Sequence, residues 1–144
     1  MRIETGTDYY YDVLAIYERL REELASRFGS VYQATKFIGK SKAYLTSPEH
    51  ITSVQNLNKI CKQCDIDFDY LILRKHNSGK YTEKKITFNT LIKTYKENCY
   101  KRRTPDSIKS IICQIIRQGK NNIKIATLLY IADFYKKNPL ELLT

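Results

Sequence analysis

Apolar residues recur at helical spacing along nearly the whole chain. The same order of apolar positions also recurs, without gaps, after a fixed shift of 71 residues. A repeat near 3.6 residues places such side chains on one face of an α-helix, so the pattern predicts an all-α fold. Recurrence at a fixed shift indicates an internal duplication. The matched positions are Tyr17 with Phe88, Leu20 with Leu91, Leu24 with Tyr95, Phe37 with Ile108, Tyr44 with Ile115, Leu45 with Ile116, Val54 with Ile125, Leu57 with Leu128, Ile60 with Ile131, Cys61 with Ala132, Cys64 with Tyr135 and Leu71 with Leu142.

A polar segment from Arg74 to Lys80 separates the two copies and contains a Ser-Gly pair, which is typical of a break between helices. A chain of 144 residues can bury one ordinary core or two small ones. We therefore predict two tandem domains of about five short helices each. The first covers residues 1–73 with a tyrosine-rich N-terminus, residues 74–84 form a linker, and the second, strongly basic domain covers residues 85–144.

Capping residues and helix breakers set the expected helix ends. In the first copy Gly29 is a natural end, Ser30 a natural N-cap, and Gly39 makes a tight turn. In the second copy Thr104 would cap a helix that opens with Pro105. The helices that we expect are 13–27, 30–38, 41–47, 53–64 and 68–73 in the first copy and 86–100, 105–118 and 123–137 in the second, with a short last turn from Pro139.

The net charge of +10 is distributed unevenly. Residues 1–78 carry 11 Lys and Arg against 10 Asp and Glu, whereas residues 79–144 carry 14 against 5. A small basic domain is typical of proteins that meet phosphate, in nucleic acid or at an anionic surface. The alternative is a basic surface that serves solubility alone.

Cys61 and Cys64 form a Cys-x-x-Cys pair that has three interpretations: a metal clamp, a redox pair or part of the core. Structural zinc needs four ligands at knuckle spacing, and a redox pair expects a strand–helix context, neither of which surrounds this pair. Together with Leu57 and Ile60 the two cysteines follow the spacing of a buried helix stripe. We therefore predict core packing, with no metal or other cofactor. The remaining metal-binding residue types are isolated: His50, His76, Cys99 and Cys113.

The sequence gives no indication of an enzyme, since it lacks a Gly-rich phosphate loop, a His-Glu-x-x-His motif and a nucleophile elbow. Asp65, Asp67 and Asp69 alternate, but the Gly and final Glu of a calcium loop are missing, so we interpret them as helix caps and surface residues. No run of about 18 apolar residues is present. The polar N-terminus does not resemble a signal peptide, and we expect a cytoplasmic protein.

The segment VYQATKFIGKSKAYL, residues 31–45, has the form helix, glycine turn, helix. It resembles the helix-turn-helix of the Cro/C1-type, or lambda-repressor-like, family, and residues 52–73 resemble the family's fourth and fifth helices. The end of the second copy, GKNNIKIATLLYIADFYKKNPLELL, is similar to the same region. The resemblance implies two tandem lambda-repressor-like domains and a second motif helix that lies in the major groove of DNA. The sequence departs from the family pattern at Val31 and Thr35, and in the second copy KRRTP, residues 101–105, stands in place of a regular helix.

On this resemblance we expect a DNA-binding regulator of transcription, of prokaryotic or phage type. Lys101, Arg102 and Arg103, just before a helix N-terminus, would suit a backbone phosphate. Base edges would be read from an exposed helix in either copy. The candidate DNA-binding residues are Gln33, Lys40, Ser41, Lys42, Tyr44, Lys101, Arg102, Arg103, Lys109, Gln114, Arg117 and Lys120.

Other partners stay open at this point. A helix-turn-helix scaffold can also be reused to bind a protein or ribonucleoprotein, for example as an inhibitor of a nucleic-acid enzyme. RNA is a third possibility, and base stacking on tyrosines would require aromatic residues interleaved with basic residues on one face. Double-stranded DNA remains the expected partner, with no membrane contact. The chain would act either as a monomer whose tandem domains imitate a dimer or as a homodimer.

Overall fold

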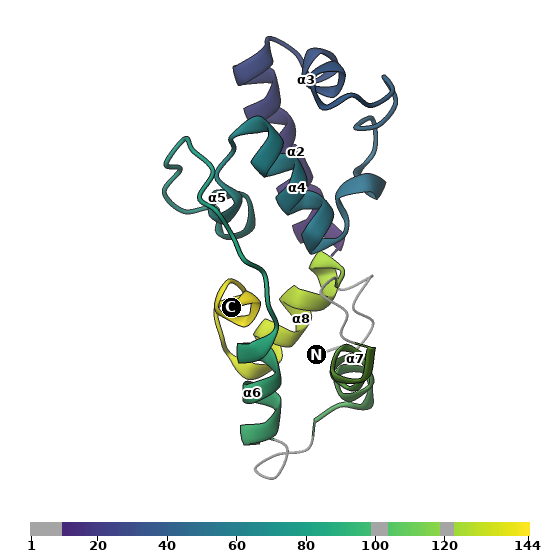
Figure 1. Ribbon diagram of the computed structural model, residues 1–144, viewed down its shortest axis with the longest axis vertical. Helices are drawn as coiled ribbons and strands as arrows, with labels where there is room; N and C mark the ends of the chain where they lie inside the picture. The colour runs from purple at the N-terminus through teal and green to yellow at the C-terminus, as the bar shows by residue number, and fades with distance from the viewer. Residues whose placement is uncertain (1–9, 99–103, 119–122) are drawn as a thin grey trace. The chain divides into compact units, whose positions relative to one another are not determined.

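The computed structural model describes residues 10–98, 104–118 and 123–144, and the prediction of an all-helical protein is confirmed over these ranges. They contain 7 α-helices, and none of the described residues lies in a strand. The chain divides into two compact units, an N-terminal unit of Tyr10–Lys84 and a C-terminal unit that includes Lys85–Thr144 (Figure 1). None of the described helices is long and apolar enough to span a membrane.

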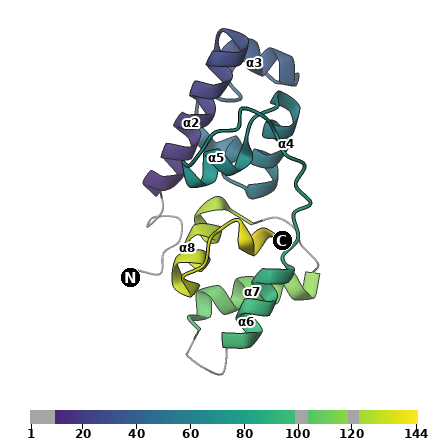
Figure 2. The same ribbon diagram turned by 90° about the vertical axis from the view of Figure 1, so that its left-hand side faces the viewer.

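The N-terminal unit is built on one long helix against which the shorter ones pack. Its elements are α2 (Tyr10–Phe28), α3 (Val31–Ile38), the short 3-10 helix η1 (Pro48–Ile51), α4 (Val54–Cys64) and α5 (Phe68–Leu73). α3 lies against the end of α2, and η1 and α5 also contact α2 (Figure 2). α2 and α4 each bury apolar side chains at helical spacing in the core of this unit: Val13, Ile16, Tyr17, Leu20, Leu24, Val54, Leu57, Ile60, Cys61 and Cys64.

Three expected helices of this unit form with the ends that the sequence indicates. Ser30 caps α3 by accepting a hydrogen bond from the Gln33 backbone N–H at 3.1 Å, and Gly39 ends the helix at φ 85°. Ser53 caps α4 in the same way, with 3.2 Å to the Asn56 N–H. α5 has the predicted bounds and is capped by Asp67. These ends follow from side chains that replace missing backbone partners.

The predicted helix over residues 41–47 is wrong, because these residues form turns. Gly39 ends α3, and Pro48 holds Ser47 in an extended conformation with φ −139° and ψ 164°, so fewer than two helical turns would fit between them. The carbonyl of Leu45 accepts hydrogen bonds from side chains of α2, which hold the loop in this course. The second helix of the expected helix-turn-helix is therefore absent from this position.

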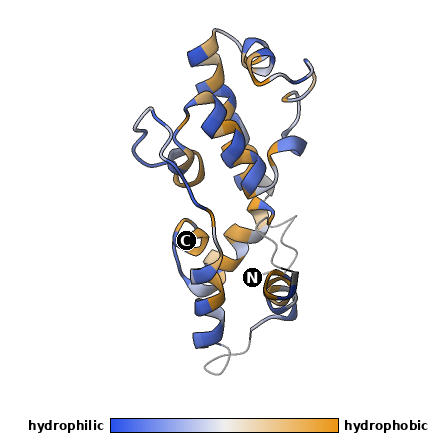
Figure 3. Cartoon of the chain, viewed as in Figure 1, coloured by the Kyte–Doolittle hydropathy of each residue, from blue (hydrophilic) through white to orange (hydrophobic). Residues whose placement is uncertain are grey.

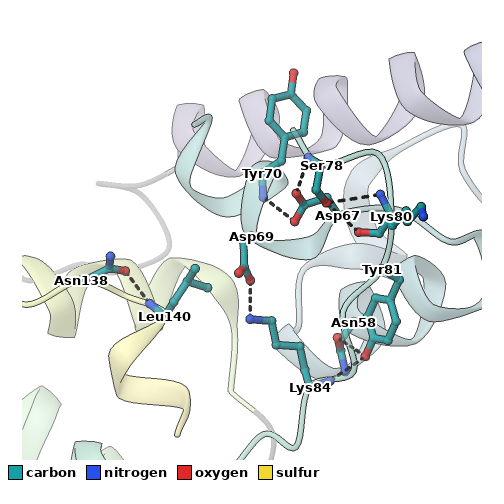
Figure 4. Close-up of polar contacts among 10 residues, drawn as sticks. All are labelled: Asn58, Asp67, Asp69, Tyr70, Ser78, Lys80, Tyr81, Lys84, Asn138 and Leu140. Carbon is teal, nitrogen blue, oxygen red and sulfur yellow. Dashed lines mark hydrogen bonds and ion pairs between the residues drawn. The ribbon is translucent and has the colours of Figure 1, made fainter. Parts of the chain in front are cut away.

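The segment after α5, predicted as a linker, lies against the N-terminal unit through three aspartates, of which Figure 4 shows Asp67 and Asp69. Asp65 accepts a hydrogen bond from the Tyr81 backbone N–H at 2.8 Å, and Asp67 accepts one from the Ser78 N–H at 2.9 Å. Asp69 pairs with the Lys84 ammonium at 2.6 Å. Asp67 and Asp69 thus connect α5 to residues 78–84, while Asp65, after α4, holds the same segment.

The C-terminal unit packs three helices around an apolar centre. Its elements are α6 (Asn89–Asn98), α7 (Asp106–Gln118), α8 (Ile125–Tyr135) and the 3-10 helix η2 (Glu141–Leu143). α8 is buried along most of its length and is mostly orange in Figure 3. The end of the chain joins α6, since the Thr87 N–H donates to the Leu143 carbonyl at 2.8 Å and the Thr90 N–H to the Thr144 carbonyl at 2.9 Å.

The prediction of Thr104 as the N-cap of α7 is wrong. The Thr104 hydroxyl is buried and finds no hydrogen-bond partner among the described residues. The Pro105 carbonyl instead accepts the first helical hydrogen bond, from the Lys109 N–H at 3.0 Å. The helix therefore begins one residue later than expected, and Pro105 takes the capping position.

α4 and α8 share the same local geometry at the 71-residue shift. Both helices have 11 residues, and each ends at a non-glycine residue in the left-handed conformation, Asp65 at φ 58° and Lys136 at φ 57°. The terminal backbone hydrogen bonds also correspond, from the Ile66 N–H to the Cys61 carbonyl and from the Lys137 N–H to the Ala132 carbonyl, both at 2.9 Å. Between residues 24 and 53 the correspondence fails, because Phe37 is exposed whereas its match Ile108 is buried.

Candidate nucleic-acid interface

Five of the predicted DNA-binding residues lie together in the N-terminal unit, on α3 and the loop that follows it. Gln33 is exposed on α3, and Lys40, Ser41 and Lys42 are exposed in the loop. A turn closed by a hydrogen bond from the Tyr44 N–H to the Ser41 carbonyl, 3.0 Å, sets Lys42 at its tip. These residues are thus gathered on one short stretch of surface, although the helix expected over residues 41–47, which would have carried three of them, is a loop.

The Tyr32 ring on α3 is the centre of one cluster of basic side chains. It is 45% exposed, a large value for an aromatic residue. The Lys36 ammonium, one helical turn further along α3, lies 5.6 Å from the ring centroid. The Lys42 ammonium reaches the same ring from the loop, at 5.4 Å. Both distances are within the range of cation–π attraction, so Tyr32 joins α3 to the loop.

The Tyr44 ring in the loop forms a second cluster. It stacks on the His50 imidazole of η1, with a centroid separation of 4.3 Å and an angle of 13° between the rings. The Lys40 ammonium lies 5.4 Å from the Tyr44 centroid. His50 also contacts the Glu49 carboxylate at 3.3 Å. The imidazole therefore covers one face of the Tyr44 ring and restrains its orientation.

Two side chains of α2 hold this loop from beneath. The Tyr17 hydroxyl donates to the Leu45 carbonyl at 2.6 Å, and the Arg21 guanidinium donates to the same carbonyl at 3.1 Å and to the Tyr17 hydroxyl at 2.8 Å. Tyr17 and Leu45 are both buried. The Leu45 carbonyl thus accepts two hydrogen bonds, and breaking them would leave a buried polar group without partners, which costs free energy. The residue next to Leu45 is Tyr44, so this clamp fixes the position of the second cluster.

We call the two clusters together the basic-aromatic surface. Its residues are Tyr32, Lys36, Lys40, Lys42, Tyr44 and His50. Residues 24–48 contain four basic residues and neither Asp nor Glu. The positive charge is therefore local, and summing charge over residues 1–78 concealed it. Sequence reasoning missed Tyr32, Lys36 and His50, although the acid-free run around them could have indicated the site.

The predicted residues of the C-terminal half are separated from this surface in the chain. Lys109, Gln114 and Arg117 are exposed on α7, opposite the buried stripe that includes Ile108 and Ile112. None of these three predicted residues takes part in an aromatic cluster like that of Tyr32 among the described contacts. The other predicted residues, Lys101, Arg102, Arg103 and Lys120, lie outside the described residues.

The Cys-x-x-Cys pair is part of the core, as the helical stripe predicts. Cys61 and Cys64 are both buried on α4. Burial raises the pKa of the Cys61 thiol well above its usual range, and it raises the pKa of Cys64 to about 11. Both thiols therefore stay protonated near neutral pH, and a protonated thiol is a poor nucleophile. Within the described residues no group of three or more His, Cys, Asp or Glu side chains could hold a metal ion.

The basic-aromatic surface offers two kinds of contact at once. Its exposed ammonium groups can neutralise phosphate, and its tyrosine rings present flat apolar faces to a planar group. No family model matches the sequence, and neither a curated protein nor a solved structure matches the chain.

Proposed function

We propose that this protein binds nucleic acid, with DNA as the expected ligand, through the basic-aromatic surface of its N-terminal unit. The observation that carries the proposal is the convergence of Lys36 and Lys42 on the Tyr32 ring, with Lys40 beside Tyr44. Three exposed ammonium groups within a run free of carboxylates create a local positive field. Phosphate is the anion that such a field attracts in a nucleic acid, and the strength of binding falls as salt rises.

We further propose that the chain is a tandem duplication of a Cro/C1-type helical domain and that it acts as a regulator in the cytoplasm. The shared ends of α4 and α8, including the left-handed Asp65 and Lys136, support the duplication. The absence of a helix over residues 41–47 means that this copy would not read the major groove with that segment. The basic α7 residues Lys109 and Arg117 would add phosphate contacts from the second unit.

A second candidate function is the binding of a protein or ribonucleoprotein partner. The observation that favours it is the exposure of Phe37, whose side chain is 62% accessible while its ring lies 4.9 Å from that of Phe28. Exposed aromatic side chains are enriched at protein interfaces. This candidate and the first one use neighbouring residues, so the same substitutions separate them.

The test compares two triple variants of equal charge. In the first, Lys36, Lys40 and Lys42 become Ala; in the second, the exposed Lys59, Lys75 and Lys80 of the same unit become Ala. Duplex DNA affinity is measured by fluorescence anisotropy over a range of NaCl concentrations. We expect the first variant to reduce the slope of log K against log salt by roughly 2 to 3, because each neutralised phosphate contributes about 0.9.

The second triple variant should leave that slope nearly unchanged. Equal losses in both variants would show that net charge alone drives binding and would contradict the proposal. If neither variant changes nucleic-acid binding while Phe37→Ser abolishes capture of a protein partner, the second candidate is the correct one. Circular dichroism checks that all variants keep the helical content of the parent.

A further inference from the structure

The basic-aromatic surface contains aromatic rings that phosphate binding alone does not need. A lysine cluster alone would hold a nucleic-acid backbone, yet this surface sets Tyr32 between two lysines and Tyr44 beside a third. In a duplex the base faces are covered by neighbouring base pairs, so an aromatic ring cannot stack on them without opening the helix. Unpaired bases present their faces freely, and aromatic side chains interleaved with basic ones are typical of proteins that bind them.

The stacking positions are also prepared in advance. The ring of Tyr44 is held by the His50 imidazole at 4.3 Å, and the backbone beside it is fixed where Tyr17 and Arg21 bond the Leu45 carbonyl. Tyr32 projects from the regular helix α3, whose N-terminus is capped by Ser30. A ring that is already in place loses little conformational freedom when a base stacks on it.

The lysines can leave the rings without breaking other contacts. Their ammonium groups lie 5.4–5.6 Å from the ring centroids, and all three side chains are exposed. Exposed cation–π contacts of this kind are weak. A phosphate next to a stacked base would draw the ammonium group away from the ring and leave the ring face to the base. One nucleotide can thus satisfy a tyrosine and a lysine together.

We propose that the basic-aromatic surface binds single-stranded nucleic acid, with bases stacked on Tyr32 and Tyr44 and backbone phosphates held by Lys36, Lys40 and Lys42. The inference rests on the proposed function, of which it names the ligand class. The groove-reading helix that duplex recognition would need is missing at residues 41–47. The surface therefore has the exposed ring and the lysines that a single strand requires. The loop over residues 41–47 does not provide the helix that would enter the groove of a duplex.

The first measurement compares strands and duplexes of one sequence. A strand of about 15 nucleotides, as DNA and as RNA, and the corresponding DNA duplex are titrated at the same salt concentration, since single-strand sites span roughly 4–16 nucleotides. We expect the single strands to bind more tightly than the duplex. We expect Tyr32→Ala to weaken strand binding about 5- to 100-fold, whereas Tyr32→Phe, which keeps the ring, changes it less than about 3-fold.

The second measurement uses the absence of tryptophan from the chain. Tyr32→Trp introduces a single indole at the proposed stacking position, and its fluorescence should be quenched as the strand binds. Tyr95→Trp, in the C-terminal unit, is the matched control and should respond weakly. A preference for DNA or for RNA strands supports the inference either way, because the unpaired base and phosphate are common to both.

Two results would overturn the inference, and only the second would also contradict the proposed function. If the duplex binds at least as tightly as the strands and Tyr32→Ala changes nothing, single-strand binding is wrong while the lysine-dependent proposed function stands. If the triple variant at Lys36, Lys40 and Lys42 behaves like its control triple with strands and duplex alike, both proposals are wrong. Tyr32→Ala should fold normally, since Tyr32 is exposed and Ala favours helices.

Discussion

The stretch from α2 to α4 and the stretch from α6 to α8 occupy the same positions under the 71-residue shift, and their first and last helices correspond while the connections between them differ. In the N-terminal unit the chain passes through α3, the left-handed Gly39 and a loop before it reaches α4. In the C-terminal unit the corresponding residues include α7, a single helix of 13 residues. The difference shows that a recurring apolar pattern can fix the core helix while the connection before it takes another form.

The loop clamp explains why the connection differs. Tyr17, Arg21 and Leu45 correspond under the shift to Phe88, Ile92 and Ile116. Phe88 has no hydroxyl and Ile92 no guanidinium, so the second unit has no donors at these positions for a loop carbonyl. Leu45 is buried and held by its carbonyl, whereas Ile116 is 48% exposed on α7. The hydroxyl of Tyr17 and the guanidinium of Arg21 are therefore present only in the unit whose loop carries the lysines.

The largest expected effect tests the part that the two stretches share. Leu57 on α4 and Leu128 on α8 are matched, and both are completely buried. We expect Leu57→Ala and Leu128→Ala each to lower the free energy of unfolding by about 2–5 kcal/mol, because each leaves a cavity. Urea unfolding followed by circular dichroism measures the loss. The exposed Lys59→Ala and Lys124→Ala serve as controls, and a neutral result at either leucine would break the comparison.

A smaller effect tests the part in which they differ. Tyr17→Phe gives the first unit the residue type of Phe88 and should cost roughly 1 kcal/mol, because Arg21 still bonds the Leu45 carbonyl. The reverse change, Phe88→Tyr, places a hydroxyl in a buried position and should cost about 1–3 kcal/mol unless it finds a partner. Both are read from urea midpoints at constant slope.

A gain of stability in Phe88→Tyr would mean that the second unit holds a partner for the hydroxyl after all. An unchanged midpoint in Tyr17→Phe would mean that the clamp does not stabilise the loop. We also expect Tyr17→Phe to weaken the single-strand binding proposed for the basic-aromatic surface. Tyr44 is the residue before Leu45, and the hydrogen bond from Tyr17 to the Leu45 carbonyl holds this part of the loop in place.

Much of the fold could be predicted because helix ends depend on local chemistry. Ser30, Gly39 and Ser53 act within three residues of the groups that they satisfy, so their roles are visible in the sequence. The buried cysteines followed from spacing alone. The loop over residues 41–47 could not be predicted in this way, since it depends on hydrogen bonds from Tyr17 and Arg21, 24 or more positions away.

The candidate site was predicted in part for the same reason. Lys40, Lys42 and Tyr44 were expected from a family-like segment, and they do lie at the surface or near it. Their grouping with Tyr32 and with His50 depends on the course of the loop between them. A segment expected to be helical would have sent these side chains in other directions. Composition averaged over a whole unit hid the acid-free run as well.

The smallest effect concerns two residues that correspond under the shift, Asp67, the N-cap of α5, and Asn138, in the turn before η2. Asp67 accepts hydrogen bonds from the Tyr70 N–H at 3.2 Å and the Ser78 N–H at 2.9 Å, and Asn138 accepts one from the Leu140 N–H at 2.9 Å (Figure 4). Burial disfavours the charged form of Asp67, but these hydrogen bonds favour it more strongly and lower its pKa. Asn138 is a neutral amide, so its contact does not depend on pH in this way.

The stabilisation from Asp67 should therefore be lost in acid. Because the folded-state pKa lies below the unfolded value of about 3.9, the contribution is complete above that value and disappears as pH falls through the folded-state pKa. Asp67→Asn makes this position resemble Asn138 and should cost less than about 1 kcal/mol at pH 7. The gap between parent and variant should close below pH 4 in urea unfolding at stepped pH, and a gap that persists or widens in acid would refute the assignment.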